Sequence, residues 1–212
     1  MGDSGTKKRI KTTKRAGKEP IQNKNNIPYF YDASKFNKGS TFTSIGNIYA
    51  TVLKEATKQD YDLIFGSAYK GIPIALSTVS ALADKYDMDI SYSFNRKEKK
   101  DHGEGGNIVG SQLKGNVLVV DDVISTGTAI RESLEIIKEN QANPVGVVVA
   151  VDRQEKGVGI YSAAQQIEQD YGIPVNSIVT LENIVHYLKE HGCYDKHLTK
   201  IEEYQAIYGV KN

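Results

Sequence analysis

The segment Val117-Leu-Val-Val-Asp-Asp-Val-Ile-Ser-Thr-Gly-Thr-Ala129 decides the fold of this chain. An apolar run leads to two adjacent acids, Asp121 and Asp122, and then to small hydroxylated residues and a glycine. An apolar-periodic stretch over 126–140 follows, so we expect a buried strand, a tight turn and a helix. Because the strand has no polar alternation, both of its faces must be covered, which is typical of a parallel sheet.

The rest of the chain repeats this alternation of short apolar runs and helical patterns. We expect strands near 62–66, 90–93, 145–151 and 177–181, and helices over 44–59, from Gly71 onward, and near 162–171, 182–190 and 198–208. This order predicts an α/β fold with a mostly parallel central sheet flanked by helices. Residues 95–110 are polar and rich in glycine, and we expect a long flexible loop there.

Composition sets further limits. The chain has 212 residues, 39% hydrophobic and 25% charged, which suits one domain with a sizeable core. The formal net charge of +1 gives no chain-wide field for a polyanionic partner. Cys193 is the only cysteine, which excludes an intrachain disulfide. No apolar run approaches the ~18 residues of a membrane span, and no secretory leader is visible, so we expect a soluble, cytoplasmic protein without a membrane partner.

Residues 1–26 differ in composition from residues 27–212, which we expect to form one folded domain. The first segment holds eight basic and two acidic side chains and few large apolar ones. This composition predicts a solvated, loosely ordered or divergent tail. The alternative is an arm that contacts nucleic acid, but no aromatic residue lies among the basic ones to stack on bases. We therefore do not expect a nucleic-acid partner.

The turn after the central strand has the chemistry of a phosphate cradle. Free backbone N–H groups at a helix start face an anion, and the hydroxyls of Ser125, Thr126 and Thr128 add donors. Gly127 allows a close approach of the backbone. The acids before the turn suit a ligand that also carries hydroxyls or a metal, as a ribose 5-phosphate does. The alternative is that one of these side chains only caps the helix, which explains one polar residue but not the whole set.

This segment resembles the motif of type I phosphoribosyltransferases that binds phosphoribosyl diphosphate (PRPP). Further segments resemble those of the orotate phosphoribosyltransferase family. These are Ile27-Pro-Tyr-Phe-Tyr31 with Phe36-Asn-Lys-Gly39, Phe65-Gly-Ser-Ala-Tyr-Lys-Gly-Ile-Pro73, Asn95-Arg-Lys-Glu-Lys-Lys-Asp-His-Gly-Glu-Gly-Gly106, and Asp152-Arg-Gln-Glu155. The resemblance runs from about Pro28 to Val210. It implies the type I phosphoribosyltransferase fold, with a small hood region and a long flexible catalytic loop.

The resemblance also implies an activity and its residues. The activity is transfer of the phosphoribosyl group from PRPP to orotate with Mg²⁺, giving orotidine 5′-monophosphate and pyrophosphate in UMP biosynthesis. The implied PRPP-binding residues are Tyr69, Lys70, Arg96, Lys97, Lys100, His102, Asp121, Asp122, Val123, Ile124, Ser125, Thr126, Gly127, Thr128 and Ala129. The implied catalytic residues are Arg96, Lys100, His102, Asp121 and Asp122. The implied orotate-binding residues are Phe30, Tyr31, Ser125 and Arg153. No metal ligand is assigned, because Mg²⁺ would be bound mainly through PRPP.

These residues suit the chemistry. Pyrophosphate leaves as a polyanion while positive charge develops on the ribose, so cations in the loop 96–102 can stabilise it. His102, with an ordinary pKa of about 6.5, could add charge or donate a proton. The alternative is a solvated charged loop. Arg153 could bind the orotate carboxylate as a fork, or form a structural ion pair with Asp152 or Glu155. In the family the loop reaches the neighbouring subunit's site, which implies a homodimer.

The chain departs from the family before residue 27. A Lys-Ser-Gly-Arg-like run is expected there, but Gln22 stands at the position of its lysine, and Lys24 is the nearest substitute. Two other functions are alternatives: a PRPP-binding transcriptional or RNA regulator, and a transferase for purine bases. The cationic loop disfavours the regulator, since a sensor has no leaving group to stabilise. Arg153 and the segment with Phe30 and Tyr31 disfavour a purine base.

Overall fold

The fold is that of a computed structural model, which describes residues 28–29, 31–55, 57, 60–100, 106–157, 159–192 and 195–210. Its strands are β1 (Leu63–Gly66), β2 (Ser91–Lys100), β3 (Gly106–Gly110), β4 (Asn116–Ile124), β5 (Asn143–Asp152) and β6 (Val175–Thr180). Its helices are η1 (Ala33–Lys35), α1 (Gly39–Glu55), α2 (Gly71–Tyr86), α3 (Thr128–Glu139), α4 (Ala163–Tyr171), α5 (Leu181–His191) and α6 (Asp195–Tyr208).

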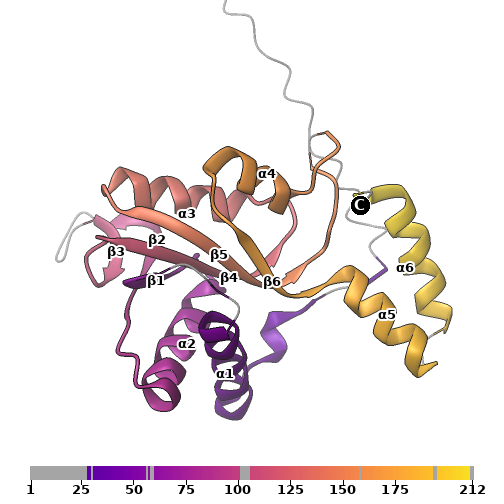
Figure 1. The fold of residues 1–212 in the computed structure, drawn as a ribbon, viewed down its shortest axis with the longest axis horizontal. Coiled ribbons are helices and arrows are strands. Elements are labelled where there is room, and N and C mark those ends of the chain that lie inside the picture. The colour runs from indigo at the N-terminus through magenta and orange to yellow at the C-terminus, as the bar shows by residue number, and fades with distance from the viewer. Residues whose placement is uncertain are drawn as a thin grey trace, which may run out of the picture.

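The strands form one sheet in the order β3-β2-β1-β4-β5-β6. Every neighbouring pair is parallel except β2 and β3. Helices α1 and α2 cover one face, and α3 and α4 cover the other (Figure 1). The predicted α/β fold with a mostly parallel sheet is confirmed.

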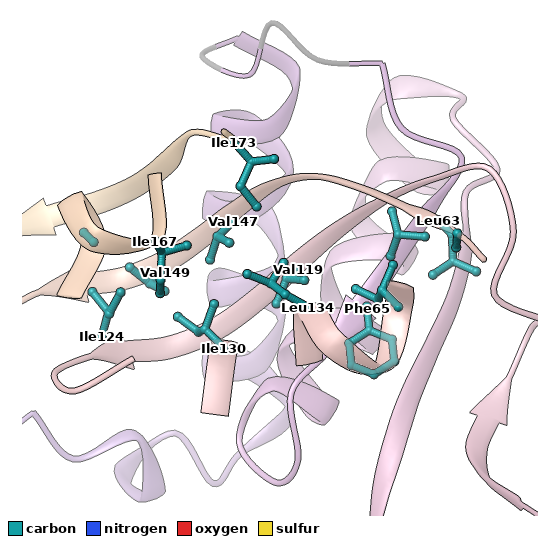
Figure 2. Packing of buried hydrophobic residues seen from close by; sticks show 14 of the residues in the cluster. Leu63, Phe65, Val119, Ile124, Ile130, Leu134, Val147, Val149, Ile167 and Ile173 are labelled. Atoms are coloured by element: carbon teal, nitrogen blue, oxygen red, sulfur yellow. The ribbon is translucent and has the colours of Figure 1, made fainter. Parts of the chain in front are cut away.

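Both faces of the central strands are apolar, as a parallel sheet between two helix layers requires. Along β4, Val119 faces α3 and α4, while Leu118 and Val120 face α1 and α2. Figure 2 shows the first of these two cores, in which Ile130 and Leu134 of α3 approach the sheet. The continuous apolar run that decides the fold is therefore shared between two cores.

Helices α5 and α6 stand beside the sheet rather than over it (Figure 1). They enclose a separate small core of Leu181, Val185 and Ile201, against which Tyr29 packs. This is the hood region expected from the resemblance, and it brings both ends of the described chain to one place. Among the described residues, no helix combines the length and apolarity needed to cross a membrane.

Two expectations about the secondary structure were wrong: the bounds of one helix, and the loop expected at 95–110. The first long helix begins at Gly39 and ends at Glu55 rather than spanning 44–59. Its first turns are polar and carry no apolar periodicity, and the hydroxyls of Thr43 and Ser44 donate to carbonyl oxygens inside the helix. The expected loop at 95–110 is largely a hairpin, in which Asn95 pairs with Ile108. In a hairpin at the sheet edge, the backbone N–H and C=O groups pair with each other while charged side chains face water. A polar composition is therefore compatible with strands as well as with a loop. Residues 101–105 lie outside the described residues.

Candidate active site

Segments that follow three neighbouring strands meet at one edge of the sheet. Residues 67–70 follow β1, and Arg153 follows β5. Asp121 and Asp122 lie near the carboxyl end of β4. Asn95 of β2 joins them, because its side-chain oxygen accepts the backbone N–H of Ala68 at 3.0 Å. This is the carboxyl edge of the parallel strands, where ligands of such sheets bind.

The loop between β1 and α2 lies tightly against β4. A Cβ atom on Gly71 would be 2.6 Å from the carbonyl oxygen of Val120, so only glycine allows α2 to start there. The ammonium of Lys70, just before the helix, lies 3.2 Å from Oδ2 of Asp122. Tyr69 is 68% exposed at the same loop and is free to meet a ligand. The structure thus brings two of the predicted PRPP-binding residues beside the acidic pair.

The acidic pair is buried and held in place. Asp121 and Asp122 are 7% and 9% exposed. The backbone N–H of Asp122 donates to Oδ1 of Asp121 at 2.9 Å, and the hydroxyl of Tyr49 donates to the carbonyl oxygen of Asp121 at 2.7 Å. Burial raises the pKa of Asp121 to about 7, and the charge of Asp122 acts in the same direction. Oδ1 of Asp122 accepts the backbone N–H of Val123 at 2.8 Å, and each carboxylate has further lone pairs that can accept hydrogen bonds from a ligand.

The turn after the acids leaves the start of α3 open. Gly127 is the N-cap in a left-handed conformation with φ of 73°, and among the described residues no side chain is recorded as accepting the first N–H groups of this helix. By contrast, Ser162 and Thr180 form capping boxes at α4 and α5. The alternative that an acid or Ser125 merely caps α3 is therefore wrong. The free N–H groups, with exposed Thr126 and Thr128 hydroxyls 3.2 Å apart, can receive a phosphate.

Not every residue of this segment offers a side chain. Ile124 is buried in the core between the sheet and α3 and α4, so only its backbone can contact a ligand. Val123, Ser125 and Ala129 are half-buried beside the turn.

The cationic residues of the β2–β3 hairpin are only partly described. The Nη1 atom of Arg96 is buried and has no hydrogen-bond partner among the described residues. The ammonium of Lys97 lies 2.9 Å from Oε2 of Glu132 on α3. The predicted residue His102, and the side chain of Lys100, lie outside the described residues. Because one of its nitrogens has no partner in the part of the chain that the structure describes and the residue is only half-buried, Arg96 is a candidate to donate to an anionic ligand.

Arg153 lies at the carboxyl end of β5 in a tightly built cluster. Its Nη2 atom donates to Oε1 of Glu155, and its Nε atom donates to the hydroxyl of Tyr29 at 3.3 Å. The ion pair with Glu155 that sequence reasoning offered as an alternative is thus present. It does not exclude a ligand, because Arg carries further N–H groups in the plane of the fork. Asp152 instead accepts the backbone N–H of Gln154 at 2.8 Å.

Tyr31 reaches the same edge from the opposite side. It lines a largely apolar cavity of about 480 Å³ together with Phe36, Tyr49 and Lys70. Burial raises the pKa of Tyr31, and the charge of Asp122 adds to this effect. The predicted orotate contact Phe30 lies outside the described residues.

Sequence reasoning missed the residues that support the site. Tyr49, Asn95, Tyr29 and Tyr204 come from elements far along the chain from the groups that they contact. Tyr49 and Tyr204 were visible only as members of helical patterns, while Tyr29 and Asn95 lie in segments that carry the resemblance but had no role assigned to them. Neither signal says which partner the polar group will meet.

Comparisons with known proteins agree with this geometry. The model of the phosphoribosyl transferase domain matches residues 42–178, so fold and site define a phosphoribosyltransferase. The orotate phosphoribosyltransferase of Photobacterium profundum is 55% identical over 183 residues, covering 86% of this chain and 85% of that protein. The chain belongs to the orotate phosphoribosyltransferase family.

Solved structures give the same result. That of Francisella tularensis orotate phosphoribosyltransferase superposes with a TM-score of 0.75 and 38% identity, covering 86% of this chain and 87% of that one. That of the Mycobacterium tuberculosis enzyme in complex with PRPP shares the fold, with a TM-score of 0.57 and 24% identity, over 73% of this chain and 83% of that one.

Proposed function

We propose that the family's reaction takes place at the carboxyl edge of β1, β4 and β5, with PRPP lying across the end of β4. The 5-phosphate is bound by the open start of α3 and by Thr126 and Thr128. The ribose hydroxyls donate to the carboxylates of Asp121 and Asp122. The observation that carries this proposal is the uncapped α3 start next to a buried pair of acids.

The pyrophosphate of PRPP is directed toward the cations on the other side of the acids. Lys70 is one of them, and its contact with Asp122 at 3.2 Å supports a position beside the ribose. Arg96, with its unpartnered Nη1 atom, is the second. When the bond from C1′ to pyrophosphate breaks, its electrons leave with pyrophosphate, and fixed cations stabilise that charge. Lys97, Lys100 and His102 extend this role along the hairpin, with His102 able to donate a proton.

Orotate is bound beyond C1′ by Arg153, which offers its remaining N–H groups to the carboxylate. Tyr31 and Phe30 frame the ring, and Ser125 donates or accepts at its edge. A ring nitrogen of orotate then attacks C1′, and the product is orotidine 5′-monophosphate, a precursor of pyrimidine nucleotides. A ligand without a carboxylate gives the remaining N–H groups of Arg153 no charged acceptor, which favours orotate over a purine base.

Mg²⁺ fits the donors present. Among the described residues, no three acidic, histidine or cysteine side chains are grouped so as to hold a metal ion, and Asp121 and Asp122 would contact Mg²⁺ only together with substrate oxygens. Mg²⁺ in such sites is held mainly by substrate phosphates and water. When bound, it supplies positive charge that stabilises the leaving pyrophosphate.

We also propose a cytoplasmic homodimer in which the β2–β3 hairpin contributes to the partner's site. Its support is the resemblance of segment 95–106, together with the position of the hairpin at the outer edge of the sheet. Mixing an Arg96→Ala variant with an Asp122→Asn variant should restore activity if each hairpin serves its neighbour. A mixture as inactive as its components would place the hairpin in its own subunit's site.

The activity is tested by following orotate absorbance after the protein is added to PRPP and Mg²⁺. Orotate should be consumed only when both are present, with pyrophosphate released in equal amount. Adenine, guanine and hypoxanthine serve as comparison substrates. Turnover of a purine base without turnover of orotate would reject the assigned base, while PRPP binding without any turnover would favour a regulator.

A further inference from the structure

The turn that carries Arg153 is fastened to the C-terminal part of the chain. The backbone N–H of Lys156 donates to the carbonyl of Tyr208 at 2.8 Å, and that of Val210 donates to the carbonyl of Gln154 at 2.9 Å. Glu155 and Gly209 form an antiparallel bridge. A short stretch after α6 thus pairs with the segment directly after Arg153, so α6 is fixed relative to that side chain.

Side chains continue this connection toward the guanidinium. The hydroxyl of Tyr204, on α6, donates to Oε1 of Glu155 at 2.9 Å. The same oxygen accepts Nη2 of Arg153, so Tyr204 and Arg153 share one acceptor. Burial raises the pKa of Tyr204, and the hydrogen bond to Glu155 acts in the same direction, so this hydroxyl stays protonated and donates.

Aromatic contacts close the cluster on its other side. The ring of Tyr29 lies edge-on to that of Tyr204, with centroids 6.2 Å apart, and the guanidinium carbon of Arg153 lies 5.2 Å from the centroid of Tyr29. The side chains of Arg153 and Glu155 are only 14% and 15% exposed. Arg153 is therefore held from several directions, while an unsupported arginine would sample many rotamers.

We propose that Tyr204 is a positioning residue for orotate binding, acting through Glu155 to fix the orientation of the Arg153 fork. This inference rests on the proposed role of Arg153 and deepens it. Glu155 alone could pair with Arg153 in more than one geometry. The Tyr204 hydroxyl occupies Oε1 together with Nη2, which limits the ion pair to one arrangement and leaves the other N–H groups of Arg153 for the ligand.

The physical consequence concerns one substrate only. Carboxylate recognition by a fork depends on the plane of the guanidinium, so a loosened Arg153 weakens orotate binding. The proposed PRPP contacts lie on β4, α3, residues 67–70 and the β2–β3 hairpin, and no hydrogen bond among the described residues joins any of them to Tyr204. We therefore expect Tyr204→Phe to raise the KM for orotate about fivefold, with little effect on the KM for PRPP or on kcat.

Tyr208→Phe is the matched control. It makes the same chemical change one turn further along α6, on a ring whose centroid lies 4.6 Å from that of Tyr204. Its side-chain hydroxyl has no hydrogen bond among the described residues, and its backbone carbonyl, which accepts Lys156, is untouched. Both variants keep the ring packing, so a merely structural role of α6 would affect them alike. Thermal unfolding of both variants checks that each is folded.

Initial rates with each substrate varied in turn decide the question. The expected result is a higher KM for orotate in Tyr204→Phe alone, and no further increase when Tyr204→Phe is added to Arg153→Ala. Equal changes of both KM values, or an unchanged KM for orotate, would overturn the inference. An unchanged KM for orotate in Arg153→Ala would reject the proposed role of Arg153 itself. A raised KM in Arg153→Ala but not in Tyr204→Phe would reject only the positioning role of Tyr204.

Discussion

The ammonium of Lys70 and the carboxylate of Asp122 lie 3.2 Å apart, joining the loop after β1 to the end of β4. The lysine side chain is about half exposed, whereas the aspartate is largely buried. An ion pair with an exposed member contributes little to the free energy of unfolding. We therefore interpret this pair as two groups held in position to bind a ligand. A substrate that carries both hydroxyls and phosphates can contact the two groups at once.

Replacing Lys70 should therefore damage substrate binding more than folding. We expect Lys70→Ala to raise the KM for PRPP about tenfold or more, since hydrogen bonds to charged groups are worth roughly 1.5–3 kcal/mol. Lys85→Ala, at the far end of the same helix, is the control and should leave the kinetics unchanged. An unaffected KM for PRPP in Lys70→Ala would remove this residue from the binding site.

Gly127 allows the phosphate turn to form. With φ of 73°, and with a Cβ atom only 3.0 Å from Cδ1 of Ile167, Gly127→Ala should cost about 1–2 kcal/mol of stability and also weaken PRPP binding. Gly172→Ala is the control, because Gly172 has φ of 68° but open space around its Cβ position. It should lose stability without losing affinity. Urea unfolding and PRPP titration measure the two effects, and equal affinity losses would argue against a local role of Gly127.

Tyr49 supports the acidic pair from α1. Its buried hydroxyl donates to the carbonyl oxygen of Asp121 at 2.7 Å, and Tyr49→Phe leaves that oxygen without this donor. We expect a loss of about 1–3 kcal/mol in the free energy of unfolding, measured by urea titration. Tyr187→Phe, at an exposed ring, should cost almost nothing. A small effect at both positions would mean that water replaces the lost donor.

The raised pKa of Asp152 predicts that the stability of the protein depends on pH. Burial raises its pKa, although the backbone N–H of Gln154 opposes this effect. The folded state then binds this proton more tightly than the unfolded state, so the contribution of Asp152 becomes less favourable as the pH rises from the unfolded pKa through the folded one.

Asp152→Asn keeps an oxygen for Gln154 and removes the charge. The variant should therefore gain stability relative to the native chain as the pH rises from about 4 toward neutrality. Chemical unfolding at several pH values measures this difference. Asp84→Asn, at an exposed position of α2, serves as the comparison. A stability difference for Asp152→Asn that stays constant with pH would contradict the raised pKa.

The core of the site could be predicted because its information is local. The strand, the acids, the turn and the helix start follow one another within residues 117–129, and each has its own pattern. The structure places them as expected, with α3 starting at Thr128. Local patterns also gave the order of strands and helices, from which a parallel sheet follows.

The rest depends on contacts that no local pattern encodes. The hairpin of β2 and β3 was expected as a loop, because pairing at a sheet edge satisfies the backbone whatever the side chains are. The cluster around Arg153 brings together residues as far apart as Tyr29 and Tyr204. Such partners are chosen by tertiary packing, so the sequence showed Arg153 but not what holds it.

Calorimetric titration of PRPP with Mg²⁺ into the folded protein tests the central claim most directly. The account predicts saturable binding in the absence of orotate, lost or strongly weakened in Asp122→Asn and in Gly127→Ala but retained in Gly172→Ala. Absence of binding to the native chain, or equal affinity in all of these variants, would contradict the claim that the end of β4 and the start of α3 hold this substrate.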